Sequence, residues 1–461
     1  MEVVAFSGPK WGQDLNNIRC EFRVIFFVVN FFALSSCSGM QDLARVDLTD
    51  EMQVALKEAS DLNDETYEVV YETSSFSDAL KVAVDASPSV QSLKKAERAV
   101  ESQLLALKSQ TEPQVTSNAR AGVVRYDNAA SESTAGIALN VLLSQLVYDG
   151  GFVAGSIDAA EAQLSLAKSQ TAQEVNKVAK DAAFAWVSLW EAQESFTLFA
   201  DLREEIINNQ NQAKRMSDVG LVDRSILDSV ERKFLAFELK RADAESSLRS
   251  AQMAYARYFK YLPAKVDYPE LPVSYNNVET RLTDEIINPS IRVAALQLII
   301  DKKNVEVKRS EFSPQVFFQV GVDSPISASE TANLRGGINV KYTIMDGGKR
   351  EAELSAAEEN VRSKRHALNA IRQETEVLSK LLLERYENAL TSEVMVRKSV
   401  ESAKERFTVA ESQIQTGKSN IVELVEARYQ YVLSEVDLLN KIAQKERLKL
   451  ELIELLGLYE D

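Results

Sequence analysis

The sequence offers few side chains that could carry out catalysis or hold a metal ion. It contains one histidine, His366, and two cysteines, Cys20 and Cys37. His366 lies in the stretch SKRHALN of a predicted long helix, and the sequence identifies no carboxylate or hydroxyl partner that would make it a general base. A zinc or thiol site needs several histidine and cysteine ligands. We therefore expect no enzyme, no cofactor and no metal site.

Lipid attachment to a cysteine is the one covalent modification that the sequence suggests. The stretch VIFFVVNFFALSSC contains an apolar run of about eleven residues, which is too short to span a bilayer as a helix. It ends in LSSC, which is similar to the bacterial lipobox, where signal peptidase cuts before a cysteine that then carries lipid. We expect residues 1–36 to be a lipoprotein-type signal peptide and Cys37 to be lipidated. A plain signal peptide and a misassigned start are the alternatives.

The composition indicates a long helical chain that does not bind nucleic acid. The 461 residues carry a net charge of −16, whereas nucleic-acid-binding domains present a basic face. Glycine and proline are scarce, and alanine, glutamate, leucine and lysine dominate, which is typical of long helices. Residues 37–75 are acidic and irregular, so we expect a tether or strap there.

The first half of the chain shows a helix, two strands and a long helix. A helical pattern ends before Pro113, and the stretches QVTSNARAGVV and AGIALNVLLSQLVY then alternate apolar and polar residues as strands do. After the triplet Asp149-Gly150-Gly151 the pattern becomes helical with heptad spacing, which predicts helices packed side by side. This helical pattern is interrupted near Gly220, where glycine suits a helix C-terminus.

The second half of the chain shows the same pattern. A helix ends at Pro314, the stretches VFFQVGV and NLRGGINVKYTIM alternate as strands, and the triplet Asp346-Gly347-Gly348 opens another long helix. The next interruption lies at Gly417. The two triplets are 197 residues apart, and the two interruptions are separated by the same interval.

We interpret this pattern as a duplication, with a first repeat over 76–262, a linker over 263–282 and a second repeat over 283–458. A helix from 151 to 220 would be about 100 Å long. The strands, at about ten residues, are long enough to cross a bilayer when tilted. Four strands cannot close into a barrel, and an open edge is not tolerated in hydrocarbon, so several chains must contribute strands.

The order of these features resembles the TolC-type outer-membrane efflux proteins, the exit ducts of tripartite pumps and type I secretion systems. The resemblance covers about Phe76 to Leu458 and rests on LVYDGG and TIMDGG after the strands, with the turns VGLVDRSILD and TGKSNIVELVEARYQY. It implies an α+β membrane protein that forms a homotrimer. Each chain would give four strands to a shared 12-stranded outer-membrane β-barrel, which continues as a long periplasmic α-helical barrel with a mixed belt near its middle.

The resemblance also assigns roles to particular residues. Glu423 and Glu426, three apart in IVELVEA, would form two acidic rings that narrow the periplasmic mouth and raise each other's pKa values. The residues that correspond to a latch in some relatives are Ser419 and Ile414, so the latch is absent or rebuilt with Lys418 or Arg428. The turns that would dock an adaptor are at Val219, Gly220, Leu221, Thr416, Gly417, Lys418 and Ser419. The triplets at Asp149, Gly150, Gly151, Asp346, Gly347 and Gly348 would be strand-to-helix turns.

The implied function is export across the outer membrane of a Gram-negative bacterium. The partners would be a periplasmic adaptor, an inner-membrane ABC or proton-driven transporter, and outer-membrane lipid. The triplets and the end of the chain soon after LIELLGLYED favour type I protein secretion slightly over drug or metal efflux, whereas the lipobox favours efflux. The alternatives are a periplasmic coiled-coil adaptor and a structural scaffold without a pore.

Overall fold

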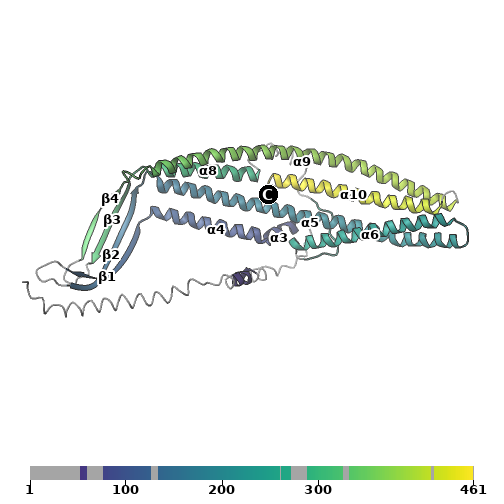
Figure 1. Ribbon diagram of the computed structural model, residues 1–461, viewed down its shortest axis with the longest axis horizontal. Helices are drawn as coiled ribbons and strands as arrows, with labels where there is room; N and C mark the ends of the chain where they lie inside the picture. The colour runs from purple at the N-terminus through teal and green to yellow at the C-terminus, as the bar shows by residue number, and fades with distance from the viewer. Residues whose placement is uncertain are drawn as a thin grey trace, which may run out of the picture. The chain divides into compact units, whose positions relative to one another are not determined.

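The chain divides into two compact units, Met1–Val69 and Val70–Asp461. The computed structural model describes residues 52–59, 76–125, 133–259, 261–270, 288–324, 332–416 and 420–459. In the first unit the described residues form one helix over 52–59, and Cys37 with the predicted signal peptide lies outside the described residues. The second unit holds the sheet and the long helices (Figure 1).

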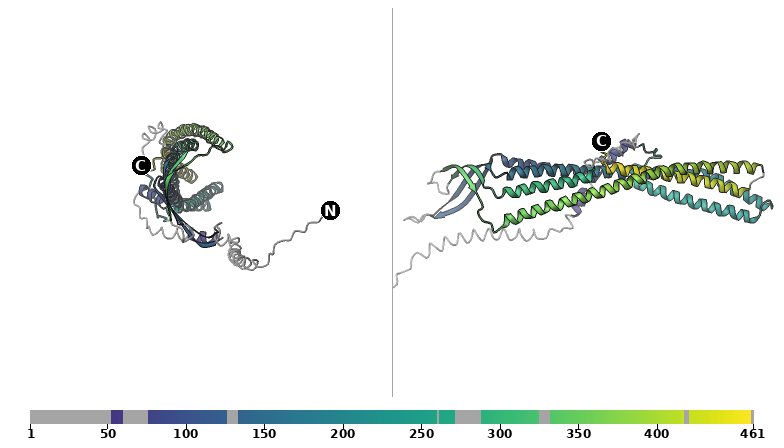
Figure 2. Two further views of the ribbon diagram at one scale, coloured as in Figure 1. Left: turned by 90° about the vertical axis from the view of Figure 1, so that its left-hand side faces the viewer. Right: turned by 90° about the horizontal axis from the view of Figure 1, so that it is seen from above.

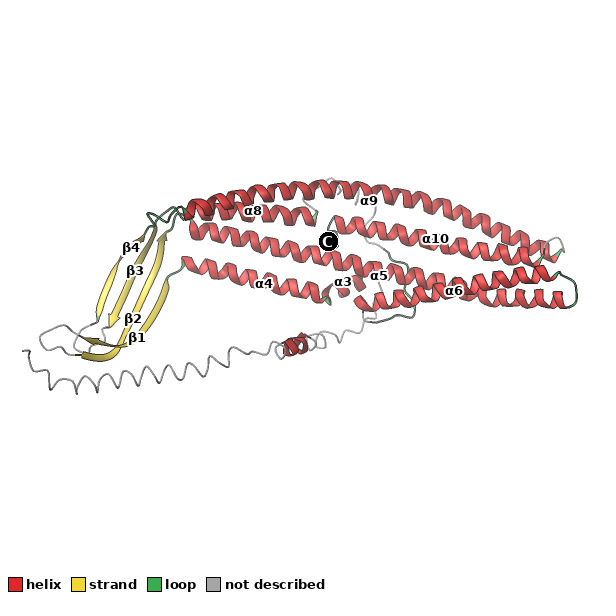
Figure 3. Ribbon diagram, viewed as in Figure 1, coloured by secondary structure: helices red, strands yellow, loops and turns green. Residues whose placement is uncertain are grey.

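Long helices of the second unit run side by side and carry the sheet at one end (Figure 3). Two of them have 67 residues, which corresponds to about 100 Å. Within the described ranges, no helix is both long and apolar enough to cross a membrane. The elements in chain order are α3 (Phe76–Asp85), α4 (Pro88–Lys108), η1 (Ser109–Thr111), β1 (Gln114–Arg125), β2 (Ser133–Tyr148), α5 (Phe152–Asp218), α6 (Arg224–Phe259), α8 (Pro289–Ser310), β3 (Gln315–Ser324), β4 (Asn333–Lys341), α9 (Lys349–Gln415) and α10 (Ile421–Leu455).

Prolines mark the ends of the shorter helices. Pro88 and Pro289 occupy the first turns of α4 and α8, where the missing N–H costs no helical hydrogen bond. Asn288 caps α8, because its side-chain oxygen accepts hydrogen bonds from the backbone N–H groups of Ser290 (3.0 Å) and Ile291 (3.1 Å). The described part of the predicted second repeat therefore begins its helix at Pro289, and residues 283–287 lie outside the described residues.

Helix α5 is the central helix and α9 lies at one side of the layer. α5 contacts α3, α4, α6, α8 and α10, whereas the helices that α9 contacts most are α8 and α10. Viewed end on, the elements follow a curved layer (Figure 2). The predicted heptad seam of α5 is buried at Val178, Ala182 and Leu189. Along α9, which contacts mainly α8 and α10 within the described residues, Val396, Val400 and Phe407 are half-buried and Ala410 is buried.

The four strands form one antiparallel sheet in the order β1-β2-β3-β4. The predicted strand over NLRGGINVKYTIM is too long, because β4 ends at Lys341. Lys341 pairs with Gln315, the first residue of β3. Beyond that pair, Pro314 has no N–H to offer, so the segment from Tyr342 to Met345 has no strand partner on this side.

The segment over 261–270 packs against the middle of α5. The Trp186 indole Nε1–H donates to the carbonyl of Asp267 (3.0 Å), and the backbone N–H of Val266 donates to the Gln193 side-chain oxygen (2.9 Å). Val266 is buried in the core that surrounds Trp186. This part of the predicted linker is thus fixed to the helices at mid-length, and residues 271–282 lie outside the described residues.

Candidate functional site

The sheet has one continuous apolar face, and that face is exposed. Strand pairing places residues of alternating positions on a common side, as in Val141 opposite Val322 and Val316 opposite Val340. Exposed side chains on this face include Val115, Val123, Ile137, Leu139, Val141, Phe318, Val322, Leu334, Ile338 and Val340. A sheet that exposes such a surface to water would be an aggregation hazard, so the face is suited to lipid or to another protein.

The opposite face of the sheet carries a cluster of polar side chains, with Leu142, Leu146 and Phe317 on the same side. The Asn140 amide of β2 bonds to the Asp323 carboxylate of β3, and Arg335 of β4 forms an ion pair with the same carboxylate (2.9 Å). Four residues further along β2, the Gln319 side-chain amide donates to the Ser144 hydroxyl at 3.4 Å. These contacts join three strands through polar side chains, as expected for a face that meets water.

The first strand-to-helix turn is capped by Asp149. Its Oδ1 accepts a hydrogen bond from the backbone N–H of Gly151 (2.9 Å), the N-cap residue, and its Oδ2 accepts one from Val153 (2.7 Å) in the first turn of α5. Gly150 and Gly151 have φ of 69° and 90°, a region that favours glycine. A Cβ on Gly150 would lie 2.2 Å from that of Ser313, so this turn is also closely packed.

The second strand-to-helix turn has the same backbone conformation as the first, but different side-chain contacts hold it in place. Asp346 accepts hydrogen bonds from the N–H groups of Gly348 (3.1 Å) and Arg350 (3.3 Å), and Gly347 and Gly348 have φ of 71° and 89°. The Arg350 guanidinium also donates to Asp346 (2.6 Å) and to the carbonyls of Glu311 and Thr343. This hydrogen bond from Arg350 lowers the pKa of the Asp346 carboxyl. Arg350 thus ties the turn to the end of α8.

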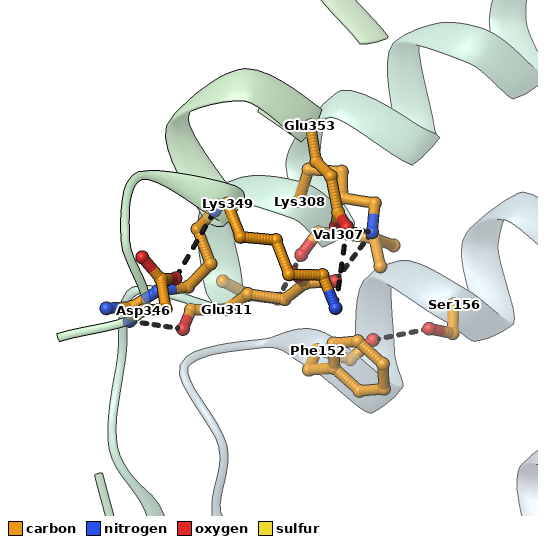
Figure 4. A network of polar contacts seen from close by, with 10 residues as sticks. Phe152, Ser156, Val307, Lys308, Glu311, Asp346, Lys349 and Glu353 are labelled. Atoms are coloured by element: carbon orange, nitrogen blue, oxygen red, sulfur yellow. Dashed lines mark hydrogen bonds and ion pairs between the residues drawn. The ribbon is translucent and has the colours of Figure 1, made fainter. Parts of the chain in front are cut away.

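Ion pairs beside this turn join α8 to α9 (Figure 4). The Lys308 ammonium of α8 lies 2.9 Å from Glu311 and 2.8 Å from Glu353 of α9, and Lys349 lies 3.7 Å from Glu353. Hydrogen bonding to both carboxylates, Glu353 first, raises the pKa of Lys308, and the bond from Lys308 lowers that of Glu353. We assign these ion pairs a structural role in holding α8 against α9, since each charged group in the cluster lies close to one of opposite charge.

The first tip at the other end of the helices is a hydrogen-bonded helix stop. Gly220 has φ of 75°, its N–H donates to the carbonyl of Ser217 (3.0 Å), and the N–H of Leu221 donates to that of Met216 (2.8 Å). This is the Schellman pattern that ends a helix on glycine. Val219 and Leu221 are 70% and 72% exposed, so the tip presents two apolar side chains. At the second tip Thr416 is exposed, and Gly417, Lys418 and Ser419 lie outside the described residues.

Glu423 and Glu426 lie at the start of α10 and line an open groove of about 1310 Å³ between α6, α9 and α10. The backbone N–H of Glu423 donates to the Asn420 cap (2.9 Å). Glu426 forms an ion pair with Lys233 of α6 and accepts a hydrogen bond from Gln430 (2.9 Å). Burial alone would raise the pKa of Glu426, but Lys233 and Gln430 together lower it. This direction is opposite to the one expected for two acidic rings.

Arg428 connects α10 to the neighbouring long helices near this groove. Its Nε donates to the Glu205 carboxylate of α5 (3.2 Å), and its guanidinium lies 4.6 Å from the ring centre of Phe407 on α9. A second stacked contact pairs Phe407 with Tyr431. Arg428, which sequence reasoning named as a candidate latch, therefore bonds to both halves of the chain.

A buried charge network joins α9 to the last third of α10, and sequence reasoning did not find it. Lys445 lies 2.9 Å from Glu393 of α9 and 3.2 Å from Glu446, and Arg397 lies 2.7 Å from Glu393. The Tyr268 hydroxyl donates to Glu446 at 2.6 Å. Glu393 and Glu446 are only 9% and 4% exposed. Through Tyr268, the network joins the segment over 261–270 to α9 and α10.

The comparisons with known proteins identify part of the chain directly. The family model described as "Outer membrane efflux protein" matches residues 286–458. These residues are therefore similar to an outer membrane efflux protein domain. A comparison with curated proteins gives no match.

Solved membrane proteins, an outer membrane channel among them, share the fold of this chain. A membrane protein from Pseudomonas aeruginosa is 16% identical with a TM-score of 0.71, over 82% of this chain and 89% of the other. The CmeC outer membrane channel of Campylobacter jejuni is 14% identical with a TM-score of 0.70, over 85% and 90%. The outer membrane protein VceC of Vibrio cholerae is 14% identical with a TM-score of 0.70, over 82% and 95%.

Removal of the Arg428 side chain should loosen the tip of the efflux protein domain. In Arg428→Ala, Glu205 and Phe407 lose their shared partner, and we expect α10 near Arg428 to open more easily, by about 1–2 kcal/mol. Hydrogen exchange resolved to peptides measures this local opening. Arg232→Ala is the control, since among the described residues Arg232 bonds only to Ser229 on its own helix. Equal exchange in α10 of both variants would contradict the role given to Arg428.

Proposed function

We propose that the chain is the subunit of a homotrimeric exit duct in the outer membrane of a Gram-negative bacterium. The observation that carries the proposal is the exposed apolar face of a four-stranded sheet, placed at the end of helices about 100 Å long. Hydrocarbon tolerates a sheet only when its edges are closed. Three copies would supply a 12-stranded barrel wide enough for a passage, with the polar face toward water.

The helices would continue the barrel through the periplasm and end at the tips. We propose that the exposed side chains of Val219 and Leu221, with Gly220, and the second turn at Thr416, Gly417, Lys418 and Ser419 dock a periplasmic adaptor. Asp149 and Asp346, with the glycines that follow them, would set the bend from tilted strand to helix. Lipid on Cys37 would anchor the N-terminus to the membrane.

The gate would lie at the start of α10, where Glu423 and Glu426 of three copies surround the mouth. The Lys233–Glu426 ion pair and the Arg428 contacts hold α10 against α6, α5 and α9, which fits a closed tip. An adaptor opens such a tip only if it binds the splayed arrangement more tightly than the packed one. The energy for export would come from an inner-membrane ABC or proton-driven transporter, and the duct itself would catalyse no reaction.

Protein cargo is slightly favoured by the Asp-Gly-Gly turns, which resemble those of type I secretion ducts, and drug or metal efflux is the other candidate. The neighbouring genes distinguish them. An ABC transporter beside a large repetitive secreted protein would support type I secretion, whereas a proton-driven pump with its adaptor would support efflux.

The mass of the purified complex tests the duct proposal. The full chain, extracted from outer-membrane fractions in mild detergent, should have the protein mass of three chains by native mass spectrometry. A monomer found in the soluble periplasmic fraction would contradict the proposal and favour an adaptor or a scaffold without a pore.

A further inference from the structure

The face of the sheet that carries the polar cluster has an excess of positive charge. The strand register places four charged residues of the described strands on this face: Arg120 of β1, Asp323 of β3, and Arg335 and Lys341 of β4. β2 contributes no charged residue. Three cations and one carboxylate give this face a net charge of +2 in each chain, whereas the whole chain carries −16.

The basic residues are spread along the strands on this face. A row of directly paired residues runs across the four strands and holds Asn118, Asn140, Asp323 and Asn333. Residues an even number of positions from this row share its face, because successive side chains of a strand point to opposite sides. Arg120 lies two positions from the row toward one end of the sheet, and Lys341 lies eight positions from it toward the other end. The two cations are therefore about 33 Å apart along the strands.

The carboxylate on this face, Asp323, is balanced by its neighbours within the sheet. Its Oδ2 lies 2.9 Å from Nη2 of Arg335, and its Oδ1 accepts a hydrogen bond from the Asn140 amide. The Asp323 side chain is 32% exposed, whereas the Arg335 side chain is 73% exposed. The carboxylate is thus covered by its partners, while the guanidinium presents most of its surface to the space in front of the sheet.

The other two cations on this face are not balanced within the described part of the chain. Arg120 and Lys341 are exposed, and neither forms an ion pair with a described residue. Arg120 lies opposite Ala138, and Lys341 lies opposite Gln315, so neither faces a negative charge across the strands. Their positive charges therefore act on whatever passes in front of the sheet.

The excess of cations on this face runs against the composition of the chain. The sequence contains 69 acidic and 53 basic residues, so a face that only had to meet water would be expected to carry more acids than bases. The inference below concerns the strands themselves. The loops that connect them carry three acids and lie outside the described residues: Asp127, Glu132 and Glu330.

We propose that the strand wall of the duct is a basic band, which attracts small anions and the anionic groups of cargo. The inference rests on the proposed trimeric duct, in which this face lines the passage, and it adds the charge that the barrel section favours. Three copies would line the passage with nine basic side chains and three carboxylates, each carboxylate beside an arginine. Arg and Lys side chains that line a pore select anions and phosphate groups, and a passage with low-dielectric walls strengthens their field.

Block of the channel by a multivalent anion tests the basic band. Inorganic triphosphate is added to a planar bilayer at low salt, where screening is weak, on the side opposite to the helical tips. It should reduce the current through the full chain. Arg120→Gln with Arg335→Gln should weaken this block at least about fivefold, because two cations of each copy leave the passage. The matched control, Arg120→Lys with Arg335→Lys, keeps the charges and should keep the block within about twofold of wild type.

Asp323→Asn should change the block in the opposite direction. Asparagine keeps the shape of the side chain and removes the negative charge beside Arg335, so the block should strengthen about two- to threefold. A general loss of structure would not weaken the block in one variant and strengthen it in another. Pores that conduct and show equal block, or none, in all forms would overturn the basic band and leave the duct standing. Assembled trimers that carry no current in any form would overturn the band and the duct together.

Discussion

Replacing Lys445 by methionine should reduce the free energy of unfolding by about 3–5 kcal/mol, the cost of removing one partner from a buried ion pair. Lys445 is the cation shared by Glu393 and Glu446, which lie on different helices and are almost fully buried. Methionine is unbranched and one heavy atom shorter than lysine, so it keeps most of the apolar part of the side chain and removes the charge. Arg397 and the Tyr268 hydroxyl would each still reach one carboxylate, and neither reaches both.

The loss should depend on pH in a way that a packing defect would not. Burial alone would raise the pKa of Glu393, but hydrogen bonds from Lys445 and Arg397 lower it. A lowered pKa contributes stability above the ordinary glutamate value of about 4.3, and the contribution is lost as pH falls through the folded-state pKa. The difference between wild type and Lys445→Met should therefore shrink as pH falls below the ordinary pKa of glutamate.

Urea unfolding in detergent at several pH values measures this difference. Lys441→Met, one turn earlier on α10, is the control, because Lys441 makes no ion pair within the described part of the chain. A Lys445→Met loss no larger than that of the control, or one that is independent of pH, would contradict the network described for α9 and α10.

Gly150→Ala should be the most damaging single change at the strand-to-helix turns. A non-glycine residue with φ of 69° costs about 1–2 kcal/mol, and overpacking against a rigid neighbour adds about 1–3 kcal/mol. The new methyl would lie 2.2 Å from the Ser313 Cβ and 3.2 Å from the carbonyl of Ser310, so α5 and the end of α8 must separate. The yield of assembled protein and its unfolding midpoint measure the effect.

Gly220→Ala separates the backbone cost from the packing cost. Gly220 has φ of 75°, close to that of Gly150, and nothing lies within 4 Å of the added Cβ. We expect only the loss of about 1–2 kcal/mol that the backbone imposes. If the two variants lost the same stability, the close packing at the first turn would have no energetic weight.

The features predicted correctly from the sequence were those with a regular spacing of apolar residues, or with glycines where the backbone has positive φ. The heptad seam of α5, the alternation in all four strands and the glycine triplets are local patterns, and the structure places Val178, Val141 and Gly150 in the predicted elements. The end of β4 was predicted wrongly, because alternation reports a strand-like sequence but not whether a partner strand is available on each side.

Contacts between distant segments could not be predicted, because nothing in the local pattern pairs one charge with another. Lys233 is separated from Glu426 by the whole second sheet hairpin and α9, and Tyr268 is equally remote from Glu446. These contacts also change the electrostatics of the proposed gate residues, since burial would raise the pKa of Glu426 but Lys233 of another helix and Gln430 lower it. Sequence spacing placed both glutamates on one helix but did not reveal this partner.

Single-channel recording of the purified full chain in a planar bilayer tests the central claim most directly. We expect a small, cation-selective conductance, which grows and loses cation selectivity in Glu423→Ala with Glu426→Ala. Asp228→Ala with Glu231→Ala, which removes two acids of the same spacing from α6, should leave both properties unchanged. Assembled oligomers that carry no current in all three forms would contradict a duct, and equal selectivity in all three would contradict the acidic mouth.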